Sequence, residues 1–188
     1  MKQRLKQFLS RRQKRHIFDP SRIKSAVILP LYYKQGEPHI LFIKRTENVT
    51  AHKGQIAFPG GTYEEADRTL LNTALRECLE EIGLTPDKVE LIGELDDQLS
   101  KGTNYVISPF VGFIPWPYQF QIDGKETEEI IEAPIVALLN EGRQRQEIID
   151  GDTVDTYSYH YKGRIIWGAT ARILSKFLDI YTSIAQDE

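Results

Sequence analysis

The sequence predicts an α/β protein in which a mixed β-sheet lies between helices, an α/β/α sandwich. Apolar, partly β-branched runs recur along the chain and indicate strands. A segment ending at Ile82 has apolar residues at spacings of three and four, which indicates a long helix lying on a core. A second long helix begins at Gly168, with Ala171, Leu174, Leu178 and Tyr181 at helical spacing.

Length and charge limit the classes of protein to consider. The chain has 188 residues, of which 40% are hydrophobic and 27% charged, and a formal net charge of −3. One domain with a sizeable core is the default at this length. A mildly acidic chain has no general attraction to nucleic acid, so an anionic substrate needs local basic residues. No run of about eighteen apolar residues exists, so we expect no transmembrane helix and no membrane partner.

The N-terminus is distinct in composition. Residues 1–20 are expected to form a basic, helical extension, and residues 21–188 the main domain. Met1–Arg15 contains seven Lys and Arg and no acidic residue, and it lacks the apolar core of a secretory signal. A surface helix packed on the domain is favoured over a mitochondrial targeting peptide, because hydroxyl residues are scarce, and over a nucleic-acid arm. The single Cys78 excludes an intrachain disulfide and suits a reducing, cytoplasmic location.

The strands follow from apolar runs separated by turn residues. A hairpin is expected around Gln35–Pro38. Ala133–Leu139 is expected to be a strand end followed by a short helix. Tyr157, Tyr159 and Tyr161 alternate as strand residues do and, with Trp167, indicate packing or a ring-stacking wall. The expected strands are Ile23–Tyr33, His39–Arg45, Gln55–Phe58, Val89–Leu99, Tyr105–Ile114, Arg143–Ile149, Thr153–Tyr161 and Ile165–Trp167.

The first long helix carries the chemistry. Asp67 is expected to cap its start and Gly83 to end it, because glycine takes a left-handed conformation freely. Its apolar stripe includes Cys78, which we therefore expect to be a buried hydrophobe rather than a nucleophile.

Three glutamates, Glu77, Glu80 and Glu81, lie at i, i+3 and i+4 and share another face of this helix. Like charges on one face repel, and a divalent cation relieves them; hard oxygen ligands suit Mg²⁺ or Mn²⁺. Arg76 is placed to hold these carboxylates, and Gly60 and Gly61 allow backbone carbonyls to approach a metal closely. The alternative is a solvated acidic face.

These residues resemble the Nudix box, Gly-x5-Glu-x7-Arg-Glu-U-x-Glu-Glu-x-Gly-U, where U is aliphatic. The match runs over Gly61–Leu84. Asp67 stands for the first Glu, Cys78 occupies an aliphatic position, and one extra residue precedes Arg76. The preceding segment, Leu41–Gly61, resembles the signature of the coenzyme A pyrophosphatase branch, whose boxes carry the same extra residue. Thr50 stands where that branch usually has arginine.

The resemblance implies a Nudix-type α/β/α sandwich and a Mg²⁺- or Mn²⁺-dependent pyrophosphohydrolase of a nucleoside-diphosphate-linked substrate, with coenzyme A and its derivatives first. A hydrolase of ADP-ribose or related compounds, and a non-catalytic nucleotide sensor, are the alternatives. Monomer and homodimer both stay open. The implied site residues are Glu77, Glu80, Glu81 and Arg76 for catalysis, the three glutamates with Gly60 and Gly61 for metal, and Arg45, His52 and Lys53 for substrate.

Two further acidic groups have two interpretations each. Glu64 and Asp67 could assist a second metal, although a capping role is favoured for Asp67. Glu128, Glu129 and Glu132 could supply a distal catalytic carboxylate, although a solvated face is favoured.

Overall fold

A computed structural model of the chain describes residues 1–47, 53–100, 103–149 and 152–186. The α-helices are α1 (Lys2–Arg11), α2 (Leu70–Ile82), α3 (Ile135–Glu141) and α4 (Gly168–Gln186), and the 3₁₀ turns are η1 (Glu65–Asp67) and η2 (Pro86–Lys88). The strands are β1 (Ile23–Lys34), β2 (Glu37–Arg45), β3 (Ile56–Ala57), β4 (Gly60–Thr62), β5 (Glu90–Glu94), β6 (Gln98–Leu99), β7 (Tyr105–Phe113), β8 (Thr127–Pro134), β9 (Gly142–Ile149), β10 (Asp152–Tyr161) and β11 (Arg164–Ile166).

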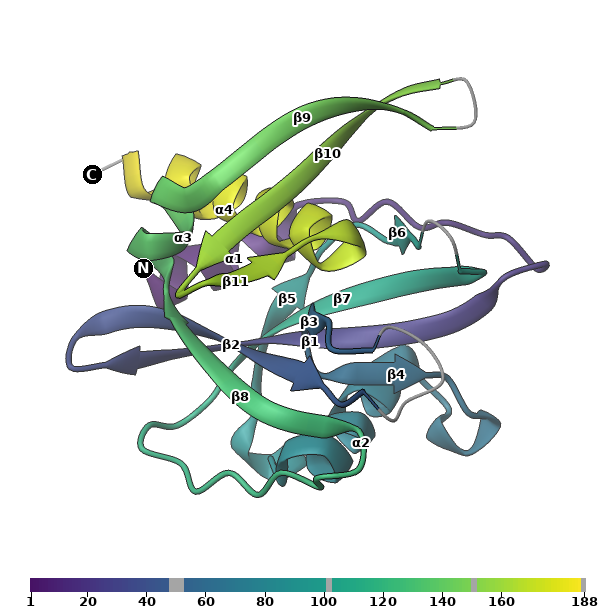
Figure 1. Ribbon diagram of the computed structural model, residues 1–188. Coiled ribbons are helices and arrows are strands. Elements are labelled where there is room, and N and C mark those ends of the chain that lie inside the picture. The colour runs from purple at the N-terminus through teal and green to yellow at the C-terminus, as the bar shows by residue number, and fades with distance from the viewer. Residues whose placement is uncertain (48–52, 101–102, 150–151, 187–188) are drawn as a thin grey trace.

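The main sheet is mixed, as the sequence predicts. Its order is β3-β2-β1-β7-β5, and β4, β6 and β8 pair with β1, β7 and β2 respectively. Strand β1 runs antiparallel to β2 and parallel to β7, with Ile28 opposite Phe110. Strands β9, β10 and β11 form a separate antiparallel sheet, from which the β9–β10 hairpin extends away from the body (Figure 1).

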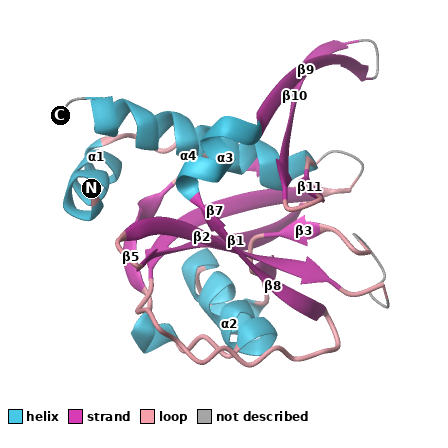
Figure 2. Ribbon diagram, turned by 60° about the vertical axis from the view of Figure 1, so that its left-hand side comes forward, coloured by secondary structure: helices cyan, strands magenta, loops and turns pink. Residues whose placement is uncertain are grey.

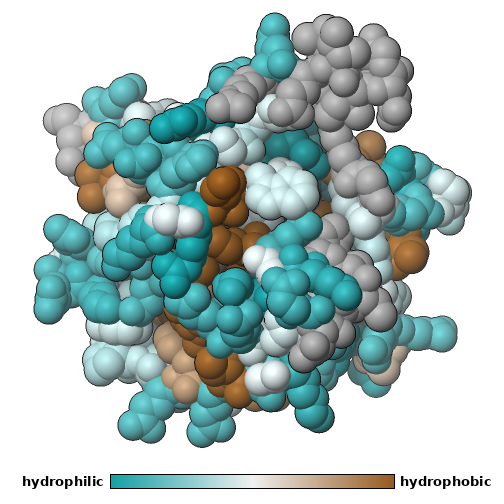
Figure 3. All heavy atoms as spheres, in the orientation of Figure 1, coloured by the Kyte–Doolittle hydropathy of each residue, from teal (hydrophilic) through white to brown (hydrophobic). Residues whose placement is uncertain are grey.

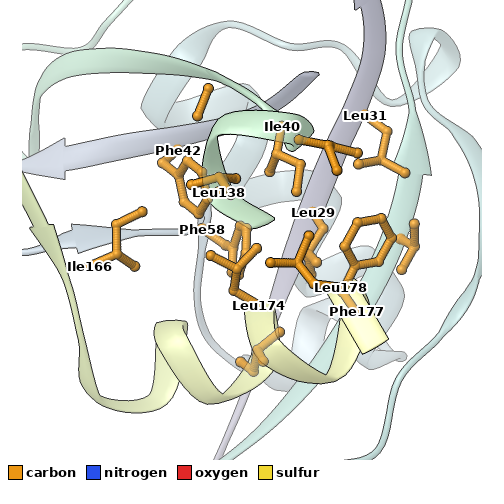
Figure 4. Packing of buried hydrophobic residues seen from close by; sticks show 14 of the residues in the cluster. Leu29, Leu31, Ile40, Phe42, Phe58, Leu138, Ile166, Leu174, Phe177 and Leu178 are labelled. Carbon is orange, nitrogen blue, oxygen red and sulfur yellow. The ribbon is translucent and has the colours of Figure 1, made fainter. Parts of the chain in front are cut away.

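Helices cover both faces of the main sheet. Helix α2 lies on one face, and α1, α3 and α4 lie on the other (Figures 1 and 2). Each face buries its own cluster of apolar residues, because alternate strand residues point to opposite faces. Phe42 and Ile40 pack towards α3 and α4, together with Leu174 and Phe177 (Figure 4). The other cluster joins Leu41 and Ile43 to α2. The α/β/α sandwich is confirmed.

Two expected elements differ from the structure. The run Val89–Leu99 is split into β5 and β6. Between them Asp96 and Asp97 accept hydrogen bonds from the backbone N–H groups of Arg15 and Ile17, at 2.8 and 3.0 Å, so the chain turns to meet the N-terminal segment. Strand β8 begins at Thr127, inside the acidic stretch, and pairs with β2 from His39 to Arg45.

The basic N-terminus forms α1, which packs beside β5 and α4. Leu5 and Leu9 are buried in the larger apolar cluster, while Lys2 and Lys6 both reach Glu90, at 2.6 and 3.0 Å. No helix within the described ranges is long and apolar enough to span a membrane.

Candidate active site

Helix α2 starts two residues later than the sequence suggested. Thr69, not Asp67, is its N-cap, and the Thr69 hydroxyl accepts a hydrogen bond from Asn72 N–H at 3.1 Å. Asp67 instead ends the 3₁₀ turn η1, where its carboxylate accepts from Glu64 N–H at 3.0 Å. Because this turn uses Asp67, the next hydroxyl residue becomes the cap. Gly83 ends the helix with φ of 67°, as expected.

Glu81 is the buried member of the glutamate set. Only 3% of its surface is exposed, although the helical spacing placed it on a polar face. Its Oε2 accepts a hydrogen bond from Gly60 N–H at 3.0 Å, and Arg45 Nη1 lies 3.5 Å from Oε1. Oε1 itself has no hydrogen-bond partner in the described chain. Burial raises the pKa of Glu81 to about 8, against the lowering effect of the Gly60 N–H and the Arg45 charge.

Glu77 lies one turn before Glu81, against the backbone of β4. A Cβ at Gly61 would overlap the Glu77 carboxylate, so only glycine lets the chain pass this close. Burial raises the pKa of Glu77, and the neighbouring Arg76 charge opposes that rise. Gly60 has φ of 150°, and a Cβ there would overlap β1 at Ala26 and Val27. The double glycine thus brings β4 next to both glutamates.

Arg76 ties the helix to the segment before it. Its Nη1 lies 2.9 Å from Glu77 Oε1 and 3.1 Å from Glu80 Oε2. Its Nη2 donates to the Thr62 carbonyl at 3.0 Å, and its Nε donates to Asp67 at 2.8 Å. Glu80 is exposed and turns outward to Arg76, whereas Glu81 turns inward to Gly60.

The donor set fits a divalent cation, although its carboxylates are turned apart. Among the described residues, no three His, Cys, Asp or Glu side chains are arranged as a ready metal site, because Arg76 holds Glu77 and Glu80 while Arg45 faces Glu81. The expectation that all three glutamates face one volume is therefore not met by these rotamers. The fit rests on Glu81 Oε1, a buried carboxylate oxygen without a hydrogen bond, and on hard oxygen donors around it.

The expected substrate residues fall into different places. Arg45 is mostly buried and pairs with Glu126 at 3.1 Å as well as facing Glu81. Lys53 is exposed, and His52, like Thr50, lies outside the described residues. Glu126 is a site residue that the sequence did not single out. Its charge raises the pKa of both Glu77 and Glu81, and no local pattern could have linked it to a helix 45 residues earlier in the chain.

The expected solvated face on β8 is confirmed for Glu128, which is exposed, but Glu129 and Glu132 are half-buried. Glu128 pairs with Lys44 at 3.0 Å, and Glu129 pairs with Arg164 at 2.5 Å. Glu132 accepts hydrogen bonds from Lys34 at 2.7 Å and from the Tyr32 hydroxyl at 2.8 Å. Each acid therefore has its own partner on another strand, β2, β11 or β1 respectively. Of the aromatic residues, Tyr159 and Tyr161 are core residues, whereas 53% of the Trp167 surface is exposed.

Comparison with known proteins decides the family. The family model described as NUDIX domain matches residues 22–150, most of the chain and the whole of α2. The chain belongs to the Nudix family. The Nudix hydrolase NudL of Yersinia pestis, named as uncharacterized, is 31% identical over 161 residues, which cover 85% of this chain and 80% of that protein. NudL of Yersinia pseudotuberculosis matches equally well. The chain is accordingly a Nudix pyrophosphohydrolase, a class that acts on nucleoside diphosphate derivatives and generally uses divalent metal ions.

Solved structures agree on the fold. An Ap4A hydrolase from C. elegans, in a binary complex, has a TM-score of 0.57 at 14% identity and covers 86% of this chain and 98% of its own. The NUDIX domain of Shewanella oneidensis NrtR, in complex with ADP ribose, has a TM-score of 0.52 at 18% identity and covers 65% and 82%. At such identities the likeness concerns the Nudix fold alone.

Proposed function

We propose that this Nudix protein hydrolyses coenzyme A or its derivatives with Mg²⁺ or Mn²⁺. Water adds to one phosphorus of the pyrophosphate, the P–O–P bridge breaks, and the products are 3′,5′-ADP and 4′-phosphopantetheine. The observation that carries the proposal is the position of Arg45 and Gly60, which lie within the segment that resembles the coenzyme A branch. Both contact Glu81, so that segment and the box form one site.

Each residue has a task that its surroundings support. Glu77, Glu80 and Glu81, with Gly60 and Gly61, would hold the cation, which neutralises charge on the pyrophosphate oxygens when bound. Glu77 or Glu81 accepts the proton of the attacking water. Arg76 positions Glu77 and Glu80 through its ion pairs.

Substrate contacts are proposed for Arg45, His52 and Lys53. Arg45 is held between Glu81 and Glu126 and keeps a buried Nε without a hydrogen-bond partner among the described residues. A guanidinium beside the box glutamates suits a phosphate oxygen, which accepts charge-assisted hydrogen bonds well.

Hydrolysis of ADP-ribose is the second candidate. Thr50 in place of the branch's arginine favours it, since a lost arginine weakens any contact with the extra phosphate of coenzyme A. The bound ADP ribose in the NrtR domain is a ligand that this fold can hold. A non-catalytic sensor is disfavoured because all three glutamates of the box are intact.

A substrate panel tests the proposal. The kcat/KM values for coenzyme A, dephospho-coenzyme A, ADP-ribose and NADH are measured in one buffer, with Mg²⁺, with Mn²⁺ and with excess EDTA. We expect coenzyme A to be cleaved, and activity to vanish in EDTA and return with either metal. If ADP-ribose is preferred by more than about tenfold, or ~1.4 kcal/mol of transition-state binding, the coenzyme A assignment fails. Full turnover in EDTA would remove the metal from the mechanism.

A further inference from the structure

A second concave site lies on the sheet face opposite α2. It is a cavity of about 270 Å³ between β3 and β11, on the side of the sheet that α3 and α4 cover. Its volume is just under the range of about 300–1,000 Å³ typical of small-molecule pockets, so it suits part of a ligand rather than the whole. The lining residues are Lys44, Lys53, Gly54, Gln55, Ile56, Arg164, Ile165 and Trp167.

Basic side chains line the cavity. Lys44, Lys53 and Arg164 are among its lining residues, and Glu128 pairs with Lys44 while Glu129 pairs with Arg164. The Glu47 carboxylate lies against Gly54, so cationic and carboxylate side chains balance here. Lys53 is exposed and has no ion pair in the described part of the chain. A phosphate group can bind this unpaired lysine, since Lys and Arg are the usual phosphate donors in proteins.

The cavity also has an aromatic wall. Trp167 is 53% exposed and Ile165 is 51% exposed, although both lie next to the buried Ile166. Figure 3 shows a mostly hydrophilic face that a narrow hydrophobic band crosses. Most of the side chains exposed on this face are therefore polar. An exposed indole beside cations suits a flat, neutral ring that is joined to a negatively charged phosphate, and such stacking binds nucleobases of every kind.

The site is near enough to the glutamates to share one substrate with them. Ile56 lines the cavity and the Gly60 N–H donates to Glu81, and the four Cα-to-Cα steps from Ile56 to Gly60 span at most about 14 Å of extended chain. Lys44 lines the cavity, whereas Arg45, the next residue of β2 across an irregular step of the β2–β8 pairing, lies 3.5 Å from Glu81. A ligand that passes round the end of β2 therefore meets the cavity at one end and Arg45 at the other.

We propose that the cavity binds the nucleoside half of the substrate. Trp167 lies against the base, and Lys53 and Arg164 bind a phosphate monoester that is separate from the pyrophosphate being cleaved. The inference rests on the proposed function and names the part of the substrate that these residues recognise. Such a cavity makes the protein selective for adenosine derivatives that carry an additional phosphate on the ribose.

The binding of two adenosine nucleotides tests the cavity assignment without catalysis. Adenosine 3′,5′-bisphosphate and 5′-AMP differ only in the ribose phosphate, and neither has a pyrophosphate to hydrolyse. Each is titrated by calorimetry into the full chain in EDTA. We expect the bisphosphate to bind at least about tenfold more tightly than AMP. Lys53→Ala should remove most of that ratio, and Trp167→Leu should weaken both ligands at least about fivefold. Both replaced side chains are exposed, so the variants should fold, which circular dichroism checks.

Lys176→Ala is the matched control, because Lys176 is an exposed lysine on α4 and does not line the cavity. It should bind both ligands like wild type. Equal affinity of the two ligands for wild type, or an unchanged ratio in Lys53→Ala, would overturn the phosphate assignment. Unchanged binding in Trp167→Leu would overturn the stacking assignment. If coenzyme A is cleaved but the bisphosphate preference and both variant effects are absent, the cavity assignment is wrong and the proposed function stands. If the preference and the variant effects are present but coenzyme A is not cleaved, the proposed function is wrong and the cavity assignment stands.

Discussion

Arg76 and Asp67 form a two-pronged ion pair, with Nε 2.8 Å from Oδ1 and Nη2 3.2 Å from Oδ2. Asp67 is buried and also accepts a hydrogen bond from the Thr73 hydroxyl at 2.8 Å. The pair fixes the guanidinium whose remaining donor side reaches Glu77 and Glu80. The acidic residue six positions after Gly61 thus acts on the glutamates through Arg76 and not by capping α2.

Replacement of Asp67 should destabilise the protein. Asp67→Asn keeps the shape but removes the buried carboxylate that pairs with Arg76, and we expect a loss of about 2 kcal/mol in the free energy of unfolding at pH 7. Asp87→Asn is the control, because Asp87 forms a fully exposed pair with Lys88 and should contribute little. Urea unfolding measures both. Equal stability of Asp67→Asn and wild type would contradict the structural role of the pair.

The Asp67 contribution should depend on pH. The hydrogen bonds from Arg76 hold the pKa of Asp67 in the folded protein below its ordinary value of 3.8. A carboxyl group with a lowered folded pKa stabilises the protein above its unfolded pKa and loses this effect as pH falls towards the folded value. The stability gap between wild type and Asp67→Asn should be constant above about pH 5 and shrink below pH 4. A gap that widens in acid would reverse this account.

The local part of the site could be predicted from the sequence. Spacings within one helix place Glu77 and Glu81 one turn apart, and Gly83 ends the helix, because these relations need only helical geometry. The choice between Asp67 and Thr69 as cap could not be made. Both residue types cap helices, and the turn η1 that separates them is closed by reciprocal hydrogen bonds between Glu64 and Asp67 and is also joined to Arg76, nine residues further on.

Gly61→Ala should disable the site without unfolding the domain. Its Cβ would overlap the Glu77 carboxylate and push that side chain away from Gly61. Misplacement of a catalytic group by about 1 Å can cost ~10²-fold in rate, and we expect a fall in kcat of that order. Thr62→Ala, at the next and exposed position, should keep the wild-type rate. A fully active Gly61→Ala enzyme would show that Glu77 does not act from its observed place.

Cys78 should be a packing residue. It is fully buried among Ala74, Ile82 and the strands beneath α2, and burial raises the pKa of its thiol. Cys78→Ala should lower the free energy of unfolding by roughly 1 kcal/mol through lost packing and leave kcat unchanged. The thiol should react with an aromatic disulfide reagent only on unfolding. A folded but inactive Cys78→Ala protein would contradict the packing role.

Arg45 should affect turnover as well as binding. A phosphate clamp remote from the reaction would change KM alone, but Arg45 also lies 3.5 Å from Glu81. Arg45→Ala should therefore raise KM and lower kcat by at least about tenfold, and Arg45→Lys should restore part of kcat by returning the charge. Steady-state kinetics with coenzyme A separates the two effects. An increase in KM with unchanged kcat would place Arg45 on the substrate only.

Relations between distant segments could not be predicted. The acids of β8 look solvated in sequence because their partners, Lys44 and Arg164, lie in other strands. Burial of Glu81 likewise depends on the β4 backbone, which the helical pattern does not show. Helix periodicity marks a polar face, but a strand that packs against that face decides which of its residues remain in water.

The most direct test of the account is the rate of Glu81→Gln. Glutamine keeps the size of Glu81 and can still accept the Gly60 hydrogen bond, but it can neither bind a cation through a charged oxygen nor take a proton from water. Glu141→Gln, an exposed change at the end of α3, is the control and should match wild type. With coenzyme A and saturating Mg²⁺, we expect kcat of Glu81→Gln to fall by at least ~10²-fold with the fold intact. A rate within about threefold of wild type would contradict the assignment of the α2 glutamates as the catalytic centre.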